Sequence, residues 1–170
     1  MASGNLLAVL KARDVIPPTA SYATMDSRVG TNVLVDVLDF DDTADESAIF
    51  LGHMPDSYAG GGLTVKIEYM MTSATTGTVS LDVSFMSITD DADDIDTKDF
   101  AAANNGNFTV PTASGEVGYE TITFSDGADS DSVAAGEDFF LKLTRDANST
   151  TSTDDATGDL EALKITIFET

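Results

Sequence analysis

From residue 32 onward, apolar and polar residues alternate with a period of two in a series of short segments. In residues 63–70, Leu63, Val65 and Ile67 fall on one face, whereas Lys66 and Glu68 fall on the other. Successive side chains of a β-strand point to opposite sides of a sheet, so this pattern is typical of strands that bury one face in a core. The same alternation marks strand candidates at residues 32–40, 47–54, 78–88, 107–110, 119–124, 139–145 and 160–168.

The segments between these candidates are rich in glycine, serine and aspartate, which is typical of turns. No long amphipathic helix is predicted anywhere in the chain. The sequence therefore predicts an all-β protein, an antiparallel β-sandwich that is jelly-roll-like and has about eight or nine strands. Residues 33–38 are apolar on both faces. Such a strand is either central in its sheet or part of a subunit interface.

The first 28 residues differ from the rest of the chain in charge. They hold three basic and two acidic residues, a net of +1, whereas residues 29–170 hold five basic and 28 acidic residues, a net of −23. Pro17-Pro18 favours extended backbone, and the apolar run before it fits a strand over residues 5–12 or a helix over residues 5–13. We expect an N-terminal strand and extended arm in residues 1–28, followed by one sandwich domain in residues 29–170.

The net charge of −22, from 30 acidic and 8 basic residues, argues against nucleic acid as a partner, because binding to phosphates requires a basic surface. The same charge disfavours anionic membrane surfaces, and no segment is apolar enough to span a bilayer. Residues 1–14 lack the features of a secretory signal peptide. The chain has no Cys, which excludes thiol nucleophiles, zinc-thiolate sites and disulfides.

Two features of the sequence are candidates for a chemical site. His53 is the only histidine; without a nucleophile and an orienting group indicated nearby, we expect it to be partly buried and structural. An acidic run contains Asp90, Asp91, Asp93, Asp94 and Asp96, whose oxygens could hold Ca²⁺, although the run lacks the glycine and closing glutamate of an EF-hand. The alternative is a solvated loop. We expect no enzymatic activity, no cofactor and no bound metal.

Several short motifs follow one another along the chain: Arg13-Asp14 with Pro17-Pro18, and then residues 22–28, 37–41, 46–50, 58–65, 73–77 and 131–137. In this order they resemble a family of β-sandwich proteins found in the virions of tailed phages. The resemblance implies a non-enzymatic virion structural protein. Its expected role is that of a capsid decoration, or cement, protein, which binds the major capsid protein at the capsid surface and stabilises the phage head.

A capsid shell offers three-fold positions, so a homotrimer is expected. The near-neutral N-terminal segment is the part expected to touch the capsid, through Lys11, Arg13, Pro17, Pro18, Tyr22 and Arg28. The alternative function is a tail-fibre or adhesin module that binds a cell-surface glycan, with or without Ca²⁺ at the acidic run. A glycoside hydrolase would need paired carboxylates beside side chains that stack on sugar, and the chain has no Trp.

Overall fold

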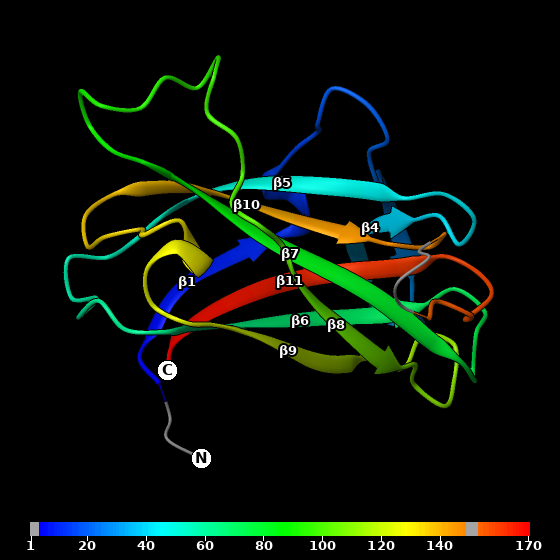
Figure 1. Cartoon of the computed structure of the whole chain (residues 1–170). Coiled ribbons are helices and arrows are strands. Elements are labelled where there is room, and N and C mark those ends of the chain that lie inside the picture. Colours follow the sequence, from blue (N-terminus) through cyan, green and yellow to red (C-terminus); the bar gives the residue numbers. More distant parts are fainter. Residues whose placement is uncertain (1–3, 149–152) are drawn as a thin grey trace.

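The computed structural model describes residues 4–148 and 153–170. Within these residues the chain forms eleven β-strands and two short 3-10 helices, η1 (Ala12–Asp14) and η2 (Ala128–Ser130). The strands build two stacked sheets (Figure 1). The six-stranded sheet contains β1 (Leu6–Lys11), β3 (Thr24–Val29), β4 (Leu34–Phe40), β6 (Leu63–Met71), β9 (Gly118–Phe124) and β11 (Leu160–Glu169). The five-stranded sheet contains β2 (Val15–Ile16), β5 (Glu46–His53), β7 (Thr78–Ile88), β8 (Asn104–Thr109) and β10 (Asp138–Arg145).

The strand order confirms the predicted antiparallel sandwich. The six-stranded sheet runs β3-β4-β11-β6-β9, with β1 paired to β11, and the five-stranded sheet runs β2-β5-β10-β7-β8. Every pairing between these strands is antiparallel. One edge of β11 is shared by two partners, because β4 pairs with its first residues and β1 with its later ones. A register shift between Ala162 and Lys164 separates the two pairings.

The core lies between the two sheets and is built from the inward positions of the predicted alternation. Leu63, Val65 and Ile67 are fully buried in it. An aromatic cluster joins the sheets, since the ring of Phe85 on β7 meets Phe124 on β9 edge-to-face at 4.9 Å and lies 5.6 Å from Phe139 on β10. Edge-to-face rings are favourable beyond their buried area. The period-two pattern thus predicted the buried faces correctly.

The N-terminal residues do not form the expected extended arm. The strand expected in residues 5–12 is present as β1, so the helical alternative is wrong, and Leu7 and Leu10 point into the core. Farther along, Ala12 and Ala23 are buried as well, and β2 and β3 join opposite sheets. The burial of these apolar side chains makes residues 4–29 an integral part of the sandwich. Residues 1–3 of the predicted arm lie outside the described residues.

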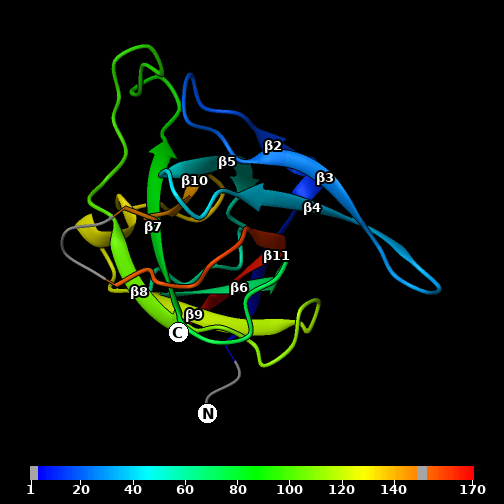
Figure 2. The same cartoon turned by 90° about the vertical axis from the view of Figure 1, so that its right-hand side faces the viewer.

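The strand that is apolar on both faces is central in its sheet, because β4 lies between β3 and β11. Val37 and Leu38 are both buried, although they point to opposite sides. The β3–β4 hairpin continues beyond the body of the sandwich (Figure 2). At its end Val29, Val33 and Leu34 are exposed. Packing within the sandwich therefore accounts for the apolar residues in the inner half of this segment. The apolar side chains at the projecting end are exposed to solvent.

A buried ion pair fixes the segment that leads into β11. The Arg145 side chain is fully buried and binds both carboxylate oxygens of Asp154 at 2.9 Å. It also donates to the carbonyl oxygens of Phe40, Ala156 and Gly158. Charges this deep require such complete pairing. Separately, no helix within residues 4–148 and 153–170 has the length and apolarity of a membrane span.

Candidate functional site

A groove of about 510 Å³ lies on the outer side of the five-stranded sheet. We call it the apolar groove. Its walls are two loops, residues 89–103 after β7 and the start of the β2–β3 connection, which rise above β5 and β10 (Figure 1). The lining residues are Ile16, Pro17, Pro18, Thr19, Ile49, Met86, Ile95, Lys98, Asp99, Phe100, Phe140 and Lys142. A concave, mostly apolar surface with a few polar groups is typical of a ligand site.

The floor of the apolar groove comes from outward positions of three adjacent strands. Phe140 on β10 lies opposite Met86 on β7, and Lys142 lies opposite Ile49 on β5. Because the inward positions of β10 fill the core, these alternate residues must face outward. Ile16 on β2 extends the floor, since it pairs with Ile49.

Lys142 links the floor to one wall. Its Nζ atom lies 4.8 Å from the centre of the Phe100 ring, within the range of a cation–π interaction. Phe100 is held in place by its neighbour, because the Ala101 amide donates to the Phe85 carbonyl at 2.9 Å. The groove therefore presents two phenylalanine rings, Phe100 and Phe140, beside an ammonium group.

The acidic run forms the outer part of this wall, and the ammonium group of Lys98 lies between two carboxylates there. Lys98 Nζ lies 2.8 Å from Asp93 Oδ2 and 3.2 Å from Asp131 Oδ2, and it donates to Ser87 Oγ at 2.9 Å. Burial lowers the pKa of Lys98, but the hydrogen bonds to Asp93 and Asp131 outweigh it, so the pKa lies above its usual value. Across the described part of the chain, no group of three or more acidic or histidine side chains is placed to share a metal ion.

The other aspartates of the run serve local turns or face solvent. Asp94 accepts a hydrogen bond from the amide of Asp96 at 3.0 Å, whereas Asp90 and Asp91 are exposed. These contacts are typical of an Asx turn in a surface loop. The structure thus favours the solvated-loop alternative for the run.

His53 differs from the expected partly buried histidine. It ends β5, its side chain is 60% exposed, and Nδ1 lies 2.7 Å from Asp138 Oδ1 on the neighbouring strand β10. The reason is its position in the alternation: Gly52 faces the Phe139 ring on the core side, so His53 points outward. A histidine and an aspartate resemble two members of a catalytic triad. Here both are more than half exposed, and they line a third pocket, of about 370 Å³.

The six residues predicted to contact a capsid do not share one surface. Lys11 and Arg13 line a second groove, of about 370 Å³, on the outer side of the six-stranded sheet. Pro17 and Pro18 line the apolar groove on the opposite sheet. Tyr22 is half exposed and forms an isolated bridge with Ser47. Whether any of them contacts a capsid stays a prediction.

Arg28, the sixth of these residues, is used within the fold. Its guanidinium pairs with Glu161 on β11 and donates to Ser114 Oγ at 3.0 Å and to the Met71 carbonyl at 3.3 Å. It thereby fastens the loop after β8 to the six-stranded sheet. Because Glu161 is 5% exposed, the pair is largely structural.

The two phenylalanines of the apolar groove were not predicted as site residues from the sequence. The signal for Phe140 was present, because the inward assignment of Phe139, Leu141 and Leu143 places Phe140 on the outer face, where an aromatic side chain is unexpected. Phe100 carried no such signal. It lies in the loop after the acidic run, and only the fold brings it over Lys142 on β10.

No family model matches this sequence, and no curated protein matches it either. The fold, however, is similar to solved carbohydrate-binding modules. One is a family 35 module from Clostridium thermocellum, with a TM-score of 0.52 and 8% identity over 96% of this chain and 98% of that one. A second is the CBM22-1 xylan-binding domain from Paenibacillus barcinonensis, with a TM-score of 0.53 and 9% identity over 99% of this chain and 97% of that one.

A third similar structure contains the CBM22-1 and GH10 modules of the Clostridium thermocellum endo-1,4-beta-D-xylanase 10B, complexed with xylohexaose. It has a TM-score of 0.53 and 15% identity, covering 98% of this chain and 29% of that one. At such low identities the likeness concerns the fold alone. The chain is an all-β jelly-roll sandwich of the kind seen in carbohydrate-binding modules.

Proposed function

We propose that this chain is a non-catalytic glycan-binding module that holds a neutral sugar chain in the apolar groove. The observation that carries the proposal is the pairing of Phe100 and Phe140 with Lys98, Asp99 and Lys142 in one concave surface. The fold supports it, since modules of similar fold are carbohydrate-binding. The glycan-binding alternative is thereby better supported than the capsid role.

The chemistry of the groove suits a sugar. A pyranose ring has apolar C–H faces, which pack against aromatic and aliphatic side chains, and a rim of hydroxyls that need hydrogen-bond partners. The phenylalanine rings, with Ile49 and Met86, supply the first kind of contact. Lys142 supplies donors and Asp99 supplies acceptors at the rim. The lack of Trp argued against sugar binding, but Phe140 and Phe100 provide aromatic surface here.

The test is affinity electrophoresis and calorimetry with a panel of soluble neutral polysaccharides that includes xylan. Phe140→Ala removes the aromatic floor and is expected to weaken binding about tenfold, or about 1.4 kcal/mol. Tyr119→Ala is the matched control, because Tyr119 is an exposed aromatic residue on the opposite sheet. Melting curves of both variants are recorded to check that each one folds. The proposal is refuted if no neutral polysaccharide binds, or if the two variants bind equally well.

The capsid-decoration role is the second candidate, and the projecting β3–β4 hairpin is the observation that favours it. Exposed Val29, Val33 and Leu34 are of the type found at protein interfaces. Truncating residues 1–28 would remove β1 and β2 and most of β3, so it would test folding rather than contact. The better test is Val29→Asp with Leu34→Asp, scored by co-sedimentation with phage heads and by electron microscopy. Undiminished binding of the variant would remove the hairpin from this role.

A further inference from the structure

The second groove, which we call the cationic groove, lies where β1 ends and η1 begins. It is lined by Lys11, Ala12, Arg13, Leu34, Val35, Asp36, Glu68, Leu163 and Lys164. The register shift in β11 falls beside it, between Ala162 and Lys164. Its surface combines an apolar part, formed by Leu34, Val35 and Leu163, with charged side chains around it.

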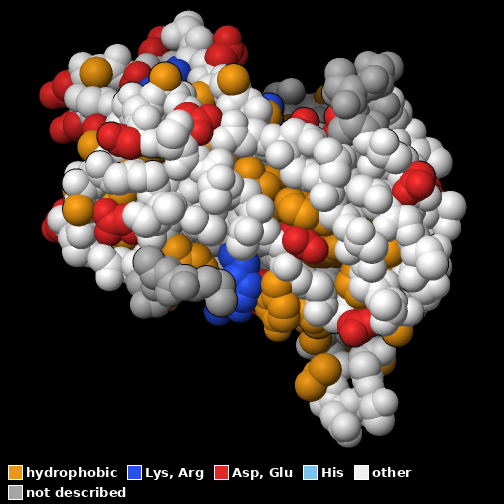
Figure 3. All heavy atoms as spheres, turned by 60° about the horizontal axis from the view of Figure 1, so that its bottom comes forward, with side chains coloured by type: hydrophobic (Ala, Val, Ile, Leu, Met, Phe, Trp, Pro, Cys, Tyr) orange, Lys and Arg blue, Asp and Glu red, His pale blue; other side chains and the backbone are white. Residues whose placement is uncertain are grey.

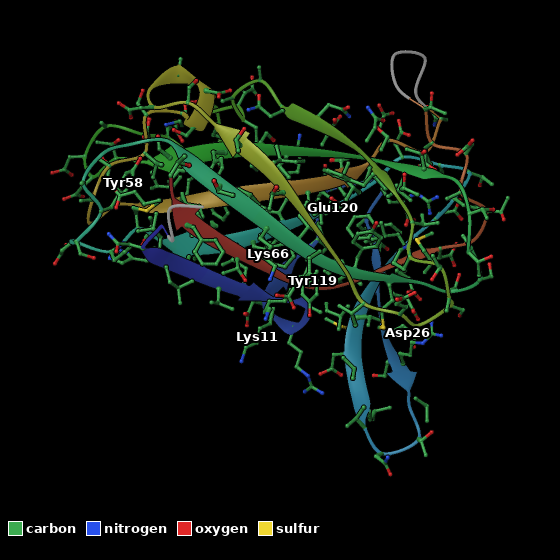
Figure 4. The ribbon with its side chains drawn as sticks, turned by 90° about the horizontal axis from the view of Figure 1, so that it is seen from below. Lys11, Asp26, Tyr58, Lys66, Tyr119 and Glu120 are labelled. Atoms are coloured by element: carbon green, nitrogen blue, oxygen red, sulfur yellow. The ribbon has the colours of Figure 1, made fainter. Side chains whose placement is uncertain are left out.

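The charge of this groove is opposite to that of the protein. Three basic residues line it, against the two acidic residues Asp36 and Glu68, whereas acidic residues outnumber basic ones 30 to 8 in the whole chain. Lys66 lies on the same outer face and places its Nζ 4.1 Å from the centre of the Tyr119 ring. Figure 4 shows Lys66 beside Tyr119 on this side, with Lys11 at the end of β1. In Figure 3, Lys and Arg side chains gather beside hydrophobic ones on this side of the molecule.

The cross-strand register places like charges side by side. Lys11 on β1 lies directly opposite Lys164 on β11, and like charges in this position destabilise a sheet. Glu68 offsets one of them, because its carboxylate lies 3.1 Å from Lys164 Nζ and 3.3 Å from Lys66 Nζ. Among the described residues, no carboxylate forms an ion pair with Lys11. Lys11 thus has no ion-pair partner there among the described residues, although the Asp14 carboxylate accepts a hydrogen bond from its backbone amide at 2.9 Å.

The positive charge of the neighbouring Arg13 is already paired with the carboxylate of Asp36. Arg13 Nη2 donates to Asp36 Oδ1 at 2.9 Å, and Nε donates to Oδ2 of the same carboxylate. This hydrogen bonding lowers the pKa of Asp36, so the pair stays ionised. The positive charge without an ion-pair partner among the described residues is therefore that of Lys11, which lies opposite the Glu68-paired Lys164.

We propose that the cationic groove is a second ligand site, which binds the anionic group of an acidic sugar, a carboxylate or a sulfate. The anion lies between the ammonium groups of Lys11 and Lys164, and the sugar ring packs against Leu34, Val35 and Leu163. The site is on the opposite sheet from the apolar groove and does not depend on it.

The distribution of charge selects this class of ligand. A nucleic acid or an anionic membrane would bring many negative charges close to a body of net charge −22. A sugar carries a single anionic group, and salt screens its interaction with charges farther away than the Debye length, about 8 Å at physiological salt. The nearby lysine pair therefore affects its binding more than the distant acidic residues do.

The test compares cellobiose with cellobiouronic acid, which replaces one hydroxymethyl group by a carboxylate, and with cellobiose 6-sulfate. Titrations are followed by two-dimensional NMR of the full chain. We expect the anionic sugars to shift the amide signals of Lys11, Arg13, Leu163 and Lys164, with an affinity at least tenfold higher than that of cellobiose at this site. The double variant Lys11→Gln with Lys164→Gln should lose this preference.

Two further measurements make the result decisive. Lys11→Gln removes a like-charge contact, so its melting temperature should equal or exceed that of the wild type, which separates lost binding from lost folding. Phe140→Ala should leave binding of anionic sugars at the cationic groove unchanged, because Phe140 lines only the apolar groove. The result for the cationic groove can therefore be separated from success or failure of the neutral-glycan proposal. Equal affinity for cellobiose, shifts confined to other residues, or equal competition by inorganic sulfate would overturn the proposal; the last would indicate an adventitious ion only.

Discussion

Replacing Asp39 by asparagine is expected to stabilise the protein above pH 6. Asp39 lies on the outer side of β4, where the register places it opposite Thr24 and Glu161. Burial, followed by the nearby charges of Glu161, Asp26 and Asp159, raises the pKa of Asp39 from 3.8 to about 6. Among the described residues, its buried Oδ1 atom has no hydrogen-bond partner. The folded state therefore favours the protonated, neutral form.

The pH window follows from the direction of this change in pKa. Below about pH 4 the carboxyl group is neutral in both states and folding carries no penalty. As the pH rises from about 4 to 6, the unfolded chain ionises more readily, so the folded state loses stability. A difference of about 2 units between the pKa of Asp39 in the folded and unfolded states corresponds to about 3 kcal/mol of stability. Part of the Asp39 side chain faces solvent, which screens its charge, so we expect about 1–2 kcal/mol.

The assay is urea unfolding of the wild type and of Asp39→Asn between pH 4 and pH 8. We expect the variant to be more stable by about 1–2 kcal/mol at pH 7.5, which is a rise in melting temperature of about 3–6 °C. The gain should shrink as the pH falls and be smallest at pH 4, close to the unfolded-state pKa of 3.8. Asp90→Asn is the control, since Asp90 is exposed and the change in net charge is the same. A gain that is independent of pH, or equal for both variants, would refute the reasoning.

Two other substitutions test the structural ion pairs. Arg145→Met leaves Asp154 buried without a cation and should cost about 3–5 kcal/mol of stability in urea unfolding; a loss below about 1 kcal/mol would contradict the buried-pair assignment. Lys98→Met leaves Asp93 and Asp131 without their shared cation and should cost about 1–3 kcal/mol. The same variant should weaken neutral-glycan binding, because Lys98 also lines the apolar groove. If stability and affinity are both unchanged, the ion pairs of Lys98 with Asp93 and Asp131 do not hold the loop that forms this side of the groove.

The fold was predictable because its main elements rest on a local pattern. The inward side chains of β6, β7, β10 and β11 follow strict alternation, and burial of those side chains stabilises the sandwich. β3 was not predicted, because it lacks this local pattern. Its sequence, TMDSRV, shows no such alternation, because the strand lies at a sheet edge and most of its side chains face solvent.

The candidate sites were much less predictable. Lys11 and Arg13 were chosen for their charge and do line a groove, but their neighbours there, Leu163 and Lys164, are at least 150 positions away in the chain. The apolar groove combines Pro17 and Pro18 with Phe100 and Phe140. Spacing along a sequence cannot indicate such groupings, because they depend on which strands pair and which loops rise over them.

The sequence by itself determined the class of this protein: an acidic, all-β sandwich without thiols, with alternate residues of each long strand assigned to a buried or an outer face. These properties follow from composition and from the two-residue repeat of a strand, which are both local. The tertiary structure decided the rest. It placed residues 4–29 within the sheets, set Lys98 between Asp93 and Asp131, and set Lys11 opposite Lys164. Each of these depends on strand order and register, which are fixed by packing between residues distant in the chain.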